Sequence, residues 1–515
     1  MKKSLYLFAT LVIALAPFVA SAVTLAGPFS DGAVLQRGMR VPVWGTAEPG
    51  ERVRVSFAGQ TAETVAEADG RWRVDFAPMD VCRDGRVLSA TGSNGGEPAE
   101  AKDVLVGEVW FCSGQSNAEL PLVGGNPRFR DGKGAMRAQM THKPLIRLCY
   151  QSTYWCNAEP RTNCLKKVVW RPCTKETLLT GPSFSAMGVY FALELFSALD
   201  VPIGIVGVWW GGTRIEAWTP ASGLASVPET AALVDTEVLG TSDFPKEGEF
   251  GGVKRAQDQP RVLWNSMLAP WAPYAMRGFI WYQGESNASD GAAYAQKMHA
   301  LYNGWAREFE NPDLRLRFVQ IAPWGDGRVP ALQKAQAAFA AEEPNAAMAV
   351  ANDVGNLHDI HPNNKETVGQ RLALLALAHD YGFDIKADSP SPREWRVEGD
   401  AFVVEFDHAE SLYLYTPEKS LEAGLELCGE DGEWKPGKIR NLNGERGLVD
   451  GARLVVASDE VPAPKKLRYL HSRPWFGAIY NEVNLPMGAF LLEAPAAEVP
   501  AEPVAVTDGG AEPVQ

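Results

Sequence analysis

The chain has 515 residues, which exceeds what one compact core holds and suggests about three domains of ~150 residues each. Hydrophobic residues make up 46%, with 16 Trp and 21 Phe, so the composition supports sizeable cores and excludes extensive intrinsic disorder. The formal net charge of −14 argues against a nucleic-acid-binding protein, which normally presents a basic face.

Residues 1–22 have the three-part organisation of a secretory signal. Two lysines precede an apolar stretch from Leu5 to about Val19, and the small residues Ala-Ser-Ala follow at 20–22. The apolar stretch is short for a membrane span and ends in small residues. We therefore expect cleavage after Ala22, export to the periplasm or the extracellular space, and no membrane association of the mature chain.

The residues that follow predict a change from β structure to α/β structure. Residues 23–105 alternate apolar and polar residues between turn signals, as in "GRWRVDFAP", which predicts a β-sandwich-like domain. From 106 to 385, apolar strands alternate with helix-like stretches at 185–199 and 368–381. This alternation is typical of parallel strands joined by crossover helices, so we expect an α/β domain there.

Strand patterns return in the C-terminal part of the chain. Segments such as "AFVVEFDH" and "RLVVAS" predict a second β-rich domain at 386–492. The last residues, 493–515, are rich in Pro, Ala and Glu, and we expect this tail to be disordered.

An insert at 149–173 is rich in cysteine. It contains four of the seven cysteines of the chain: Cys149, Cys156, Cys164 and Cys173. Their spacings lack the close pairs of a zinc site, and export permits disulfides. We therefore expect two disulfides in this insert, with the pairing left open. The remaining three cysteines are an odd number, so at least one thiol is expected to be buried and free.

Three segments of the α/β region share one pattern, an apolar strand followed by glycine and polar residues. They are "EVWFCSGQSN" (108–117), "GIVGVWWGGT" (204–213) and "GFIWYQGESN" (278–287). In an open parallel sheet, ligands bind outside the carboxyl ends of the strands. Polar residues at these three ends are therefore expected to converge in a catalytic or binding crevice.

A fourth segment, "LHDIHPNNKETVGQRL", supplies a candidate base. Asp359 and His361 are two residues apart, so their side chains point the same way in an extended stretch. The carboxylate can then accept the Nδ1 proton and leave Nε2 free as a base, while the following helix N-terminus disfavours the imidazolium. The alternative is that Asp359 caps the helix and His361 is an ordinary surface residue.

These residues predict nucleophilic catalysis by serine. A hydroxyl is a poor nucleophile until a base takes its proton, so we pair Ser116 with His361. The developing oxyanion needs fixed donors, and the amide of Ser116, an amide of Gly211 or Gly212 and the side chain of Gln283 are suitable. Four further side chains are expected to contact substrate or support the site, the last also being a reserve oxyanion donor: Gln115, Asn117, Glu285 and Asn287.

Two other chemistries fit the sequence less well. The α/β-hydrolase elbow has the pattern G-x-S-x-G, whereas this chain has G-Q-S-N-A with Ala118 in the last place. His358 with His361 could suggest a metal pair, but no further Cys, His or Asp set at ligand spacing supports it. We therefore expect no metal.

Taken together, the motifs resemble those of the sialate O-acetylesterase family, a branch of the SGNH/GDSL hydrolases. They are "GQSN", "WWGGT", "WYQGESN" and "DIHPNNK", in this order, and similar segments near both ends extend the resemblance to most of residues 24–492. The resemblance implies a flavodoxin-like three-layer α/β/α catalytic domain flanked by β-rich domains. It also implies hydrolysis of O-acetyl esters on a sugar, typically sialic acid, without a cofactor.

Carried over by position, the resemblance gives Ser116 as nucleophile, His361 as base and the oxyanion donors already named. Many SGNH enzymes carry the acid three residues before the histidine, but here that residue is His358. Asp359 is our candidate acid, Asp353 is the alternative, and a Ser–His dyad is a third arrangement. The predicted function is a secreted carbohydrate O-acetylesterase that forms an acetyl-Ser116 intermediate and has an O-acetylated sugar or glycan as its partner.

Two alternative functions stay open from the sequence. One is an acetylesterase acting on acetylxylan or another polysaccharide, and the other is a non-catalytic glycan-binding protein with the same fold. The oligomeric state is also left open.

Overall fold

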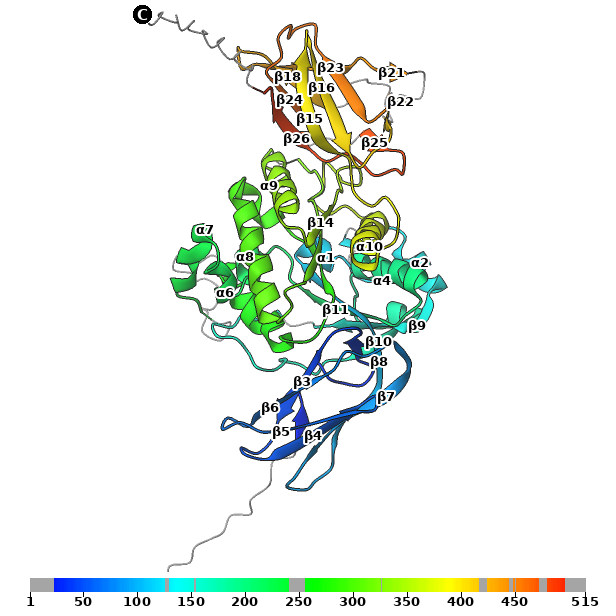
Figure 1. Ribbon diagram of the computed structural model, residues 1–515, viewed down its shortest axis with the longest axis vertical. Helices are drawn as coiled ribbons and strands as arrows, with labels where there is room; N and C mark the ends of the chain where they lie inside the picture. Colours follow the sequence, from blue (N-terminus) through cyan, green and yellow to red (C-terminus); the bar gives the residue numbers. More distant parts are fainter. Residues whose placement is uncertain are drawn as a thin grey trace, which may run out of the picture. The chain divides into compact units, whose positions relative to one another are not determined.

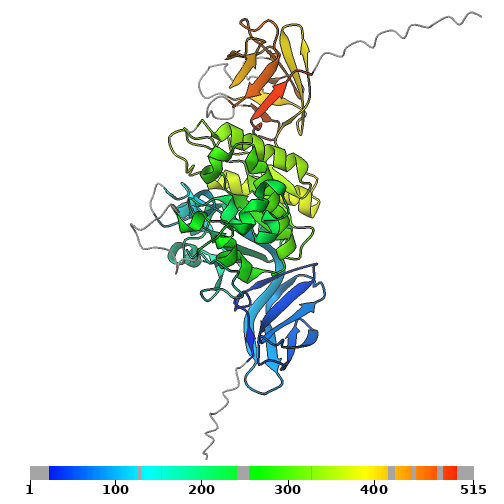
Figure 2. The same ribbon diagram turned by 90° about the vertical axis from the view of Figure 1, so that its left-hand side faces the viewer.

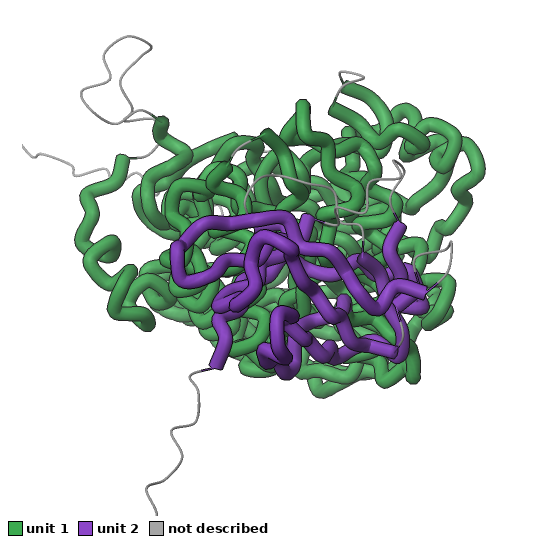
Figure 3. Tube along the Cα trace, turned by 90° about the horizontal axis from the view of Figure 1, so that it is seen from above, with its two compact units in different colours: residues 1–388, 473–476 green, residues 389–472, 477–515 purple. Residues whose placement is uncertain are grey.

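The computed structural model describes residues 23–125, 129–151, 154–239, 255–325, 327–415, 424–443, 448–449, 451–471 and 479–495. Contacts divide the chain into two units, residues 1–388 with 473–476 and residues 389–472 with 477–515 (Figure 3). The predicted signal segment and nearly all of the predicted tail lie outside the described residues. Within those ranges, no helix combines the length and apolarity that a bilayer span requires.

The first part of unit 1 consists of short strands whose side chains alternate between core and solvent. In β4, for example, Val53, Val55 and Phe57 are buried and the residues between them are exposed. The strands are β1 Thr24–Leu25, β2 Val34–Gln36, β3 Val41–Thr46, β4 Arg52–Phe57, β5 Gln60–Val65, β6 Arg71–Phe76 and β7 Cys82–Gly92. Three of them, in the order β1-β3-β6, form a sheet of their own.

A 16-residue strand, β8 (Ala99–Gly114), connects this part to the central sheet. Its first half pairs with β2 and β7. Its second half, from Glu108 to Gly114, pairs in parallel with β11 (Ile203–Trp209). The domain boundary expected at 105 therefore lies inside one continuous strand.

The central sheet has the strand order β10-β9-β11-β8-β12-β13-β14. All neighbours in it are parallel except the edge pair β10–β9. Numbered along the chain, β8, β11, β12, β13 and β14 lie in the order 2-1-3-4-5, which is the flavodoxin-like order. This order confirms the predicted α/β class. The remaining bounds are β9 His142–Tyr150, β10 Trp170–Thr174, β12 Gly278–Tyr282, β13 Arg315–Val319 and β14 Ala346–Ala349.

Helices cover both faces of this sheet and give three layers (Figure 1). The longer ones are α4 Ala186–Leu199, α8 Ala293–Glu308, α9 Val329–Glu342 and α10 Lys365–Tyr381, so the two helices expected from the sequence are confirmed. The shorter ones are α1 Ser116–Glu119, α2 Gly134–Met140, α3 Lys175–Thr180, α5 Ile215–Trp218, α6 Ala221–Leu224 and α7 Pro228–Ala231.

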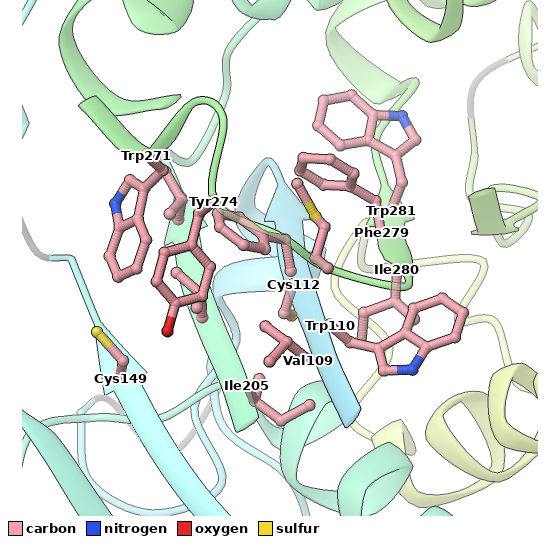
Figure 4. Close-up of a cluster of buried hydrophobic side chains, with 14 of the residues drawn as sticks. Val109, Trp110, Cys112, Cys149, Ile205, Trp271, Tyr274, Phe279, Ile280 and Trp281 are labelled. Carbon is pink, nitrogen blue, oxygen red and sulfur yellow. The ribbon is translucent and has the colours of Figure 1, made fainter. Parts of the chain in front are cut away.

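The buried aromatic residues of the strands explain the layers. Trp110 on β8 contacts Phe191 of α4 edge to face and donates a hydrogen bond to Tyr381 of α10. On the opposite face, Phe279 of β12 stacks on Trp305 of α8 at 4.0 Å between ring centroids. Figure 4 shows side chains of β8, β11 and β12 in this core. Because strands buried on both faces need apolar residues throughout, these segments are continuous hydrophobic runs.

The described residues of unit 2 form three four-stranded sheets, yellow to red in Figures 1 and 2. The first contains β15 Ser391–Glu398, β16 Ala401–Asp407, β20 Lys438–Ile439 and β23 Arg453–Ala457. The second contains β17 Leu412–Leu414, β21 Leu442–Asn443, β22 Leu448–Val449 and β25 Ile479–Asn481. The third contains β18 Leu425–Cys428, β19 Trp434–Pro436, β24 Lys466–Tyr469 and β26 Phe490–Glu493. This is the β-rich composition expected for the C-terminal part.

The prediction of two disulfides in the cysteine-rich insert is wrong in this structure. Cys149, Cys164 and Cys173 carry free thiols. The register of β9 and β10 places Cys149 opposite Trp170 and Cys173 opposite Lys143, which separates these two thiols along the strands. Burial raises the pKa of Cys164 and of Cys173 to about 12, as expected for thiols that serve as apolar core groups. The crowding of cysteines in the sequence therefore reflects core packing.

Candidate active site

Ser116 lies at a sharp turn between the central strand β8 and the short helix α1. Gly114, the last residue of β8, has φ +140°, and a Cβ there would lie 2.1 Å from the carbonyl oxygen of Tyr282. Glycine is therefore required for the turn. The next residue, Gln115, donates its amide to the same carbonyl, and Ser116 begins α1 at the carboxyl end of the sheet.

His361 meets Ser116 from the loop that precedes α10. Its Nε2 lies 2.8 Å from the Ser116 Oγ, although the two residues are 245 positions apart in the chain. The loop ends where Asn364 caps α10 by accepting a hydrogen bond from the Thr367 amide. Burial lowers the pKa of the His361 imidazole below its usual value, with Asp359 opposing that shift. The ring is therefore neutral at neutral pH, as a general base must be.

Asp359 is the carboxylate next to His361, but its strongest bond is to the backbone. Asp359 Oδ1 accepts the His361 amide at 2.9 Å, whereas its distance to His361 Nδ1 is 3.5 Å. Across the described residues, Nδ1 has no hydrogen-bond partner. Asp359 therefore holds the turn and acts on the ring mainly through its charge.

The alternative acid, Asp353, is bound elsewhere. Both of its oxygens accept hydrogen bonds from the guanidinium of Arg371, each at 2.7 Å. A bidentate pair of this kind holds the Asp353 carboxylate against Arg371, which lies on α10. Of the two carboxylates that the sequence left open, the structure places Asp359 beside the imidazole.

A cavity of 280 Å³ contains both reacting side chains. It is lined by Ser116, Glu119, Leu120, Pro121, Phe129 and His361. The ring of Phe129 contacts the His361 ring edge to face, with 5.0 Å between centroids. A larger cavity of 770 Å³, lined by Trp44, Trp264 and other residues, contains neither Ser116 nor His361, so we place the chemistry in the smaller one.

Gly211, a predicted oxyanion donor, lies next to Ser116. A Cβ on Gly211 would be 3.4 Å from the Cβ of Ser116, so a side chain at this position would contact the nucleophile. The Gly211 N–H is donated to Glu119 Oε2 at 2.8 Å. Gly212, with φ +70°, turns the chain directly after it.

Gln283 and Asn287 lie beneath the site in a closed network. Gln283 is fully buried and donates its two amide hydrogens to Thr213 O at 3.0 Å and to Asn287 Oδ1 at 2.7 Å. Asn287 in turn donates to Glu216 and Asp290. Since a side-chain amide has two hydrogens, neither residue has one left for an oxyanion in this arrangement.

Comparison of the chain with known proteins identifies its family and several of its relatives. A model of the family described as "Carbohydrate esterase, sialic acid-specific acetylesterase" matches residues 106–378, more than half of the chain. The chain belongs to this family. The match includes Ser116 and His361, so the chain is a serine esterase by family.

The curated relatives include the sialate O-acetylesterase of Homo sapiens, which is 28% identical over 376 residues, covering 66% of this chain and 67% of the human protein. The Mus musculus sialate O-acetylesterase is 28% identical over 463 residues, covering 79% of this chain and 83% of the mouse protein. Among solved structures, a carbohydrate acetylesterase from Xanthomonas citri is 30% identical with a TM-score of 0.77, covering 92% of this chain and 99% of that one.

In this esterase, Asn117 connects the serine helix to the histidine loop. Its Nδ2 donates to Glu285 Oε1 at 2.5 Å and to the carbonyl of Ile360 at 3.0 Å, and its Oδ1 accepts from Lys365 Nζ at 2.7 Å. Gln115 supports the same region, because its Oε1 accepts the Ser286 amide. The predicted supporting residues Gln115, Asn117 and Glu285 therefore lie together.

Lys365 is a residue of the site that the sequence analysis did not single out. It is fully buried, donates to Asn117 and to the carbonyl of Pro362, and lies 4.9 Å from the Tyr282 ring centroid. Burial lowers the pKa of Lys365 to about 7 and raises the pKa of Glu285 above its usual value. A lysine in the first turn of a helix is unfavourable because it opposes the helix dipole. Its position at the start of α10 is therefore the signal in the sequence that could have indicated a specific partner for Lys365.

The described residues offer no group of three or more His, Cys, Asp or Glu side chains that could hold a metal. His358 is exposed, and its backbone amide is bound to Asn356.

Proposed function

We propose that this esterase removes O-acetyl groups from a sugar, with sialic acid the preferred sugar, through an acetyl-Ser116 intermediate. The observation that carries the proposal is the 2.8 Å contact between His361 Nε2 and Ser116 Oγ. The names of the mammalian relatives and of the Xanthomonas citri protein support acetylated carbohydrates as substrates.

In the proposed mechanism, His361 Nε2 takes the Ser116 proton as Oγ attacks the acetyl carbonyl carbon. The negative charge develops on the carbonyl oxygen, for which the amides of Ser116 and Gly211 are the proposed donors, the Gly211 amide leaving Glu119 Oε2 to do so. His361 then gives the proton to the sugar oxygen, the C–O bond breaks, and the acetyl group stays on Ser116. Water, deprotonated by His361, attacks this ester and releases acetate and the free serine.

We also propose that the protein is exported after cleavage behind Ala22, because residues 1–22 carry a signal pattern. N-terminal sequencing of the protein from a periplasmic or culture fraction tests this. The domain plan is likewise a proposal, with β-rich parts at 23–105 and 386–492 flanking a catalytic part at 106–385. The change from contact unit 1 to unit 2 after residue 388 supports the second of these boundaries.

Acetate release tests the function. Wild-type protein and the Ser116→Ala and His361→Gln variants are incubated with O-acetylated sialic acid, acetylated xylan and acetylated pectin. We expect release from the sialic acid ester by the wild type alone, with unchanged circular dichroism in both variants. Wild-type rates in Ser116→Ala would refute the nucleophile, release from xylan alone would make the protein a polysaccharide acetylesterase, and glycan binding without turnover would make it a binding protein.

A further inference from the structure

Glu119 is a charged residue at the reacting centre for which the mechanism above has no use. It is the last residue of α1, three positions after Ser116 and therefore on the same side of that helical turn. Its Oε2 accepts the Gly211 amide at 2.8 Å, and its Oε1 accepts the Tyr154 hydroxyl at 2.5 Å. Among the described residues, each carboxylate oxygen thus has one donor.

Glu119 is also distinctive within the cavity. Of the described residues that line it, Leu120, Pro121 and Phe129 are apolar, and Ser116 and His361 are committed to the reaction. Glu119 is the remaining lining side chain that can accept hydrogen bonds. A sugar offers hydroxyl donors beside its ester, whereas a simple acetyl ester offers none.

The position of Glu119 leads to an exchange of partners when an ester binds. The Gly211 amide is the donor that the ester's carbonyl oxygen needs, so ester binding removes that donor from Glu119 Oε2. A carboxylate that loses a donor in a largely apolar cavity is destabilised unless another donor replaces it. A hydroxyl on the carbon next to the ester-bearing carbon is such a donor.

We propose that Glu119 is a substrate-recognition residue that accepts a hydrogen bond from a free sugar hydroxyl adjacent to the acetylated one. The inference rests on the proposed function and names its substrate class, sugars that carry an acetyl ester next to an unmodified hydroxyl. Tyr154, from the cysteine-rich insert, holds the other oxygen of Glu119 in both states.

The test is a double-mutant cycle between enzyme and substrate. The probes are a methyl glycoside with one acetyl ester and one free neighbouring hydroxyl, and its deoxy analogue that lacks that hydroxyl. In the wild type, removing the hydroxyl is expected to lower kcat/KM about tenfold or more, the range for a hydrogen bond to a charged group. In Glu119→Ala, we expect the two probes to be hydrolysed with equal kcat/KM.

The proposal is overturned if removing the hydroxyl lowers kcat/KM by the same factor in wild type and in Glu119→Ala. In that case the variant loses activity equally on both probes, which is the result of a purely structural role. Glu229→Gln, an exposed residue of α7, loses the same charge outside the cavity and is expected to behave as wild type. Ser116→Ala keeps the two proposals separate, because wild-type rates in that variant refute the nucleophile whatever Glu119 does.

Discussion

Asp359→Asn separates the charge of this residue from its backbone contact. Asparagine retains an Oδ1 that can accept the His361 amide, which Asp359 accepts at 2.9 Å, so the turn is expected to survive. What disappears is a negative charge 3.5 Å from Nδ1. Both side chains are partly exposed, 18% for His361 and 35% for Asp359, so water screens the pair and its attraction is at most about 1 kcal/mol.

The pH profile of kcat/KM for 4-nitrophenyl acetate measures this effect. The reaction needs neutral His361, so activity is present above the pKa of the imidazole and is lost as the pH falls through it. Asp359 raises this pKa, so its removal should shift the acid limb to lower pH. At neutral pH we expect kcat/KM to fall about tenfold, because the imidazolium that forms when His361 takes the Ser116 proton no longer has the Asp359 charge beside it. A larger loss is not expected, because the weak Nδ1 contact contributes little to orienting the ring.

A loss near ~10⁴-fold, the size found when the aspartate of a full catalytic triad is neutralised, would refute the charge-only role of Asp359. A shift of the acid limb to higher pH would contradict the sign. Asp353→Asn is the matched control, since it weakens the bidentate pair with Arg371 and is expected to lower thermal stability without moving the acid limb.

Three further predictions follow from the same geometry. Lys365→Met removes a positive charge that lowers the pKa of His361, so the acid limb of the same pH profile should move to higher pH. Gly114→Ala places a Cβ against a backbone carbonyl at φ +140°, and chemical denaturation should show a loss of more than about 1 kcal/mol together with lower kcat. Cys149 and Cys173 should resist alkylation in the native protein and react after unfolding without reductant, as mass spectrometry of the labelled peptides will show.

Much of the fold could be predicted because the strands and helices of the catalytic part carry strong patterns. The helices at 185–199 and 368–381 follow from apolar residues at helical spacing. The continuity of β8 did not follow, since its residues change from mostly exposed to continuously buried within one strand. That change records a change of surroundings, from a sheet with one exposed face to a sheet buried on both faces.

The candidate site could be predicted where residues lie at strand ends, because parallel strands bring those ends together. Ser116 and Gly211 follow β8 and β11 and lie near each other for this reason, while His361 reaches Ser116 from the loop before α10. The orientation of side-chain amides is a different matter, since it depends on which partners they find. Gln283 and Asn287 look like oxyanion donors in the sequence, but in the structure their amide hydrogens are donated within a buried network. Lys365 and Glu119 have hydrogen-bond partners that are distant in the sequence and come near only in the folded chain.

The long strand β8 also limits how this protein can change over evolution or in the laboratory. Side chains alternate along a strand, so one residue inserted between 107 and 113 would exchange the residues that face α4 with those that face α8. The same slip would carry the nucleophile toward the wrong side of the sheet. Length changes are therefore expected to be tolerated in the turn before β8, whereas the length of the strand and of the turn at 114–116 after it sets the position of the nucleophile.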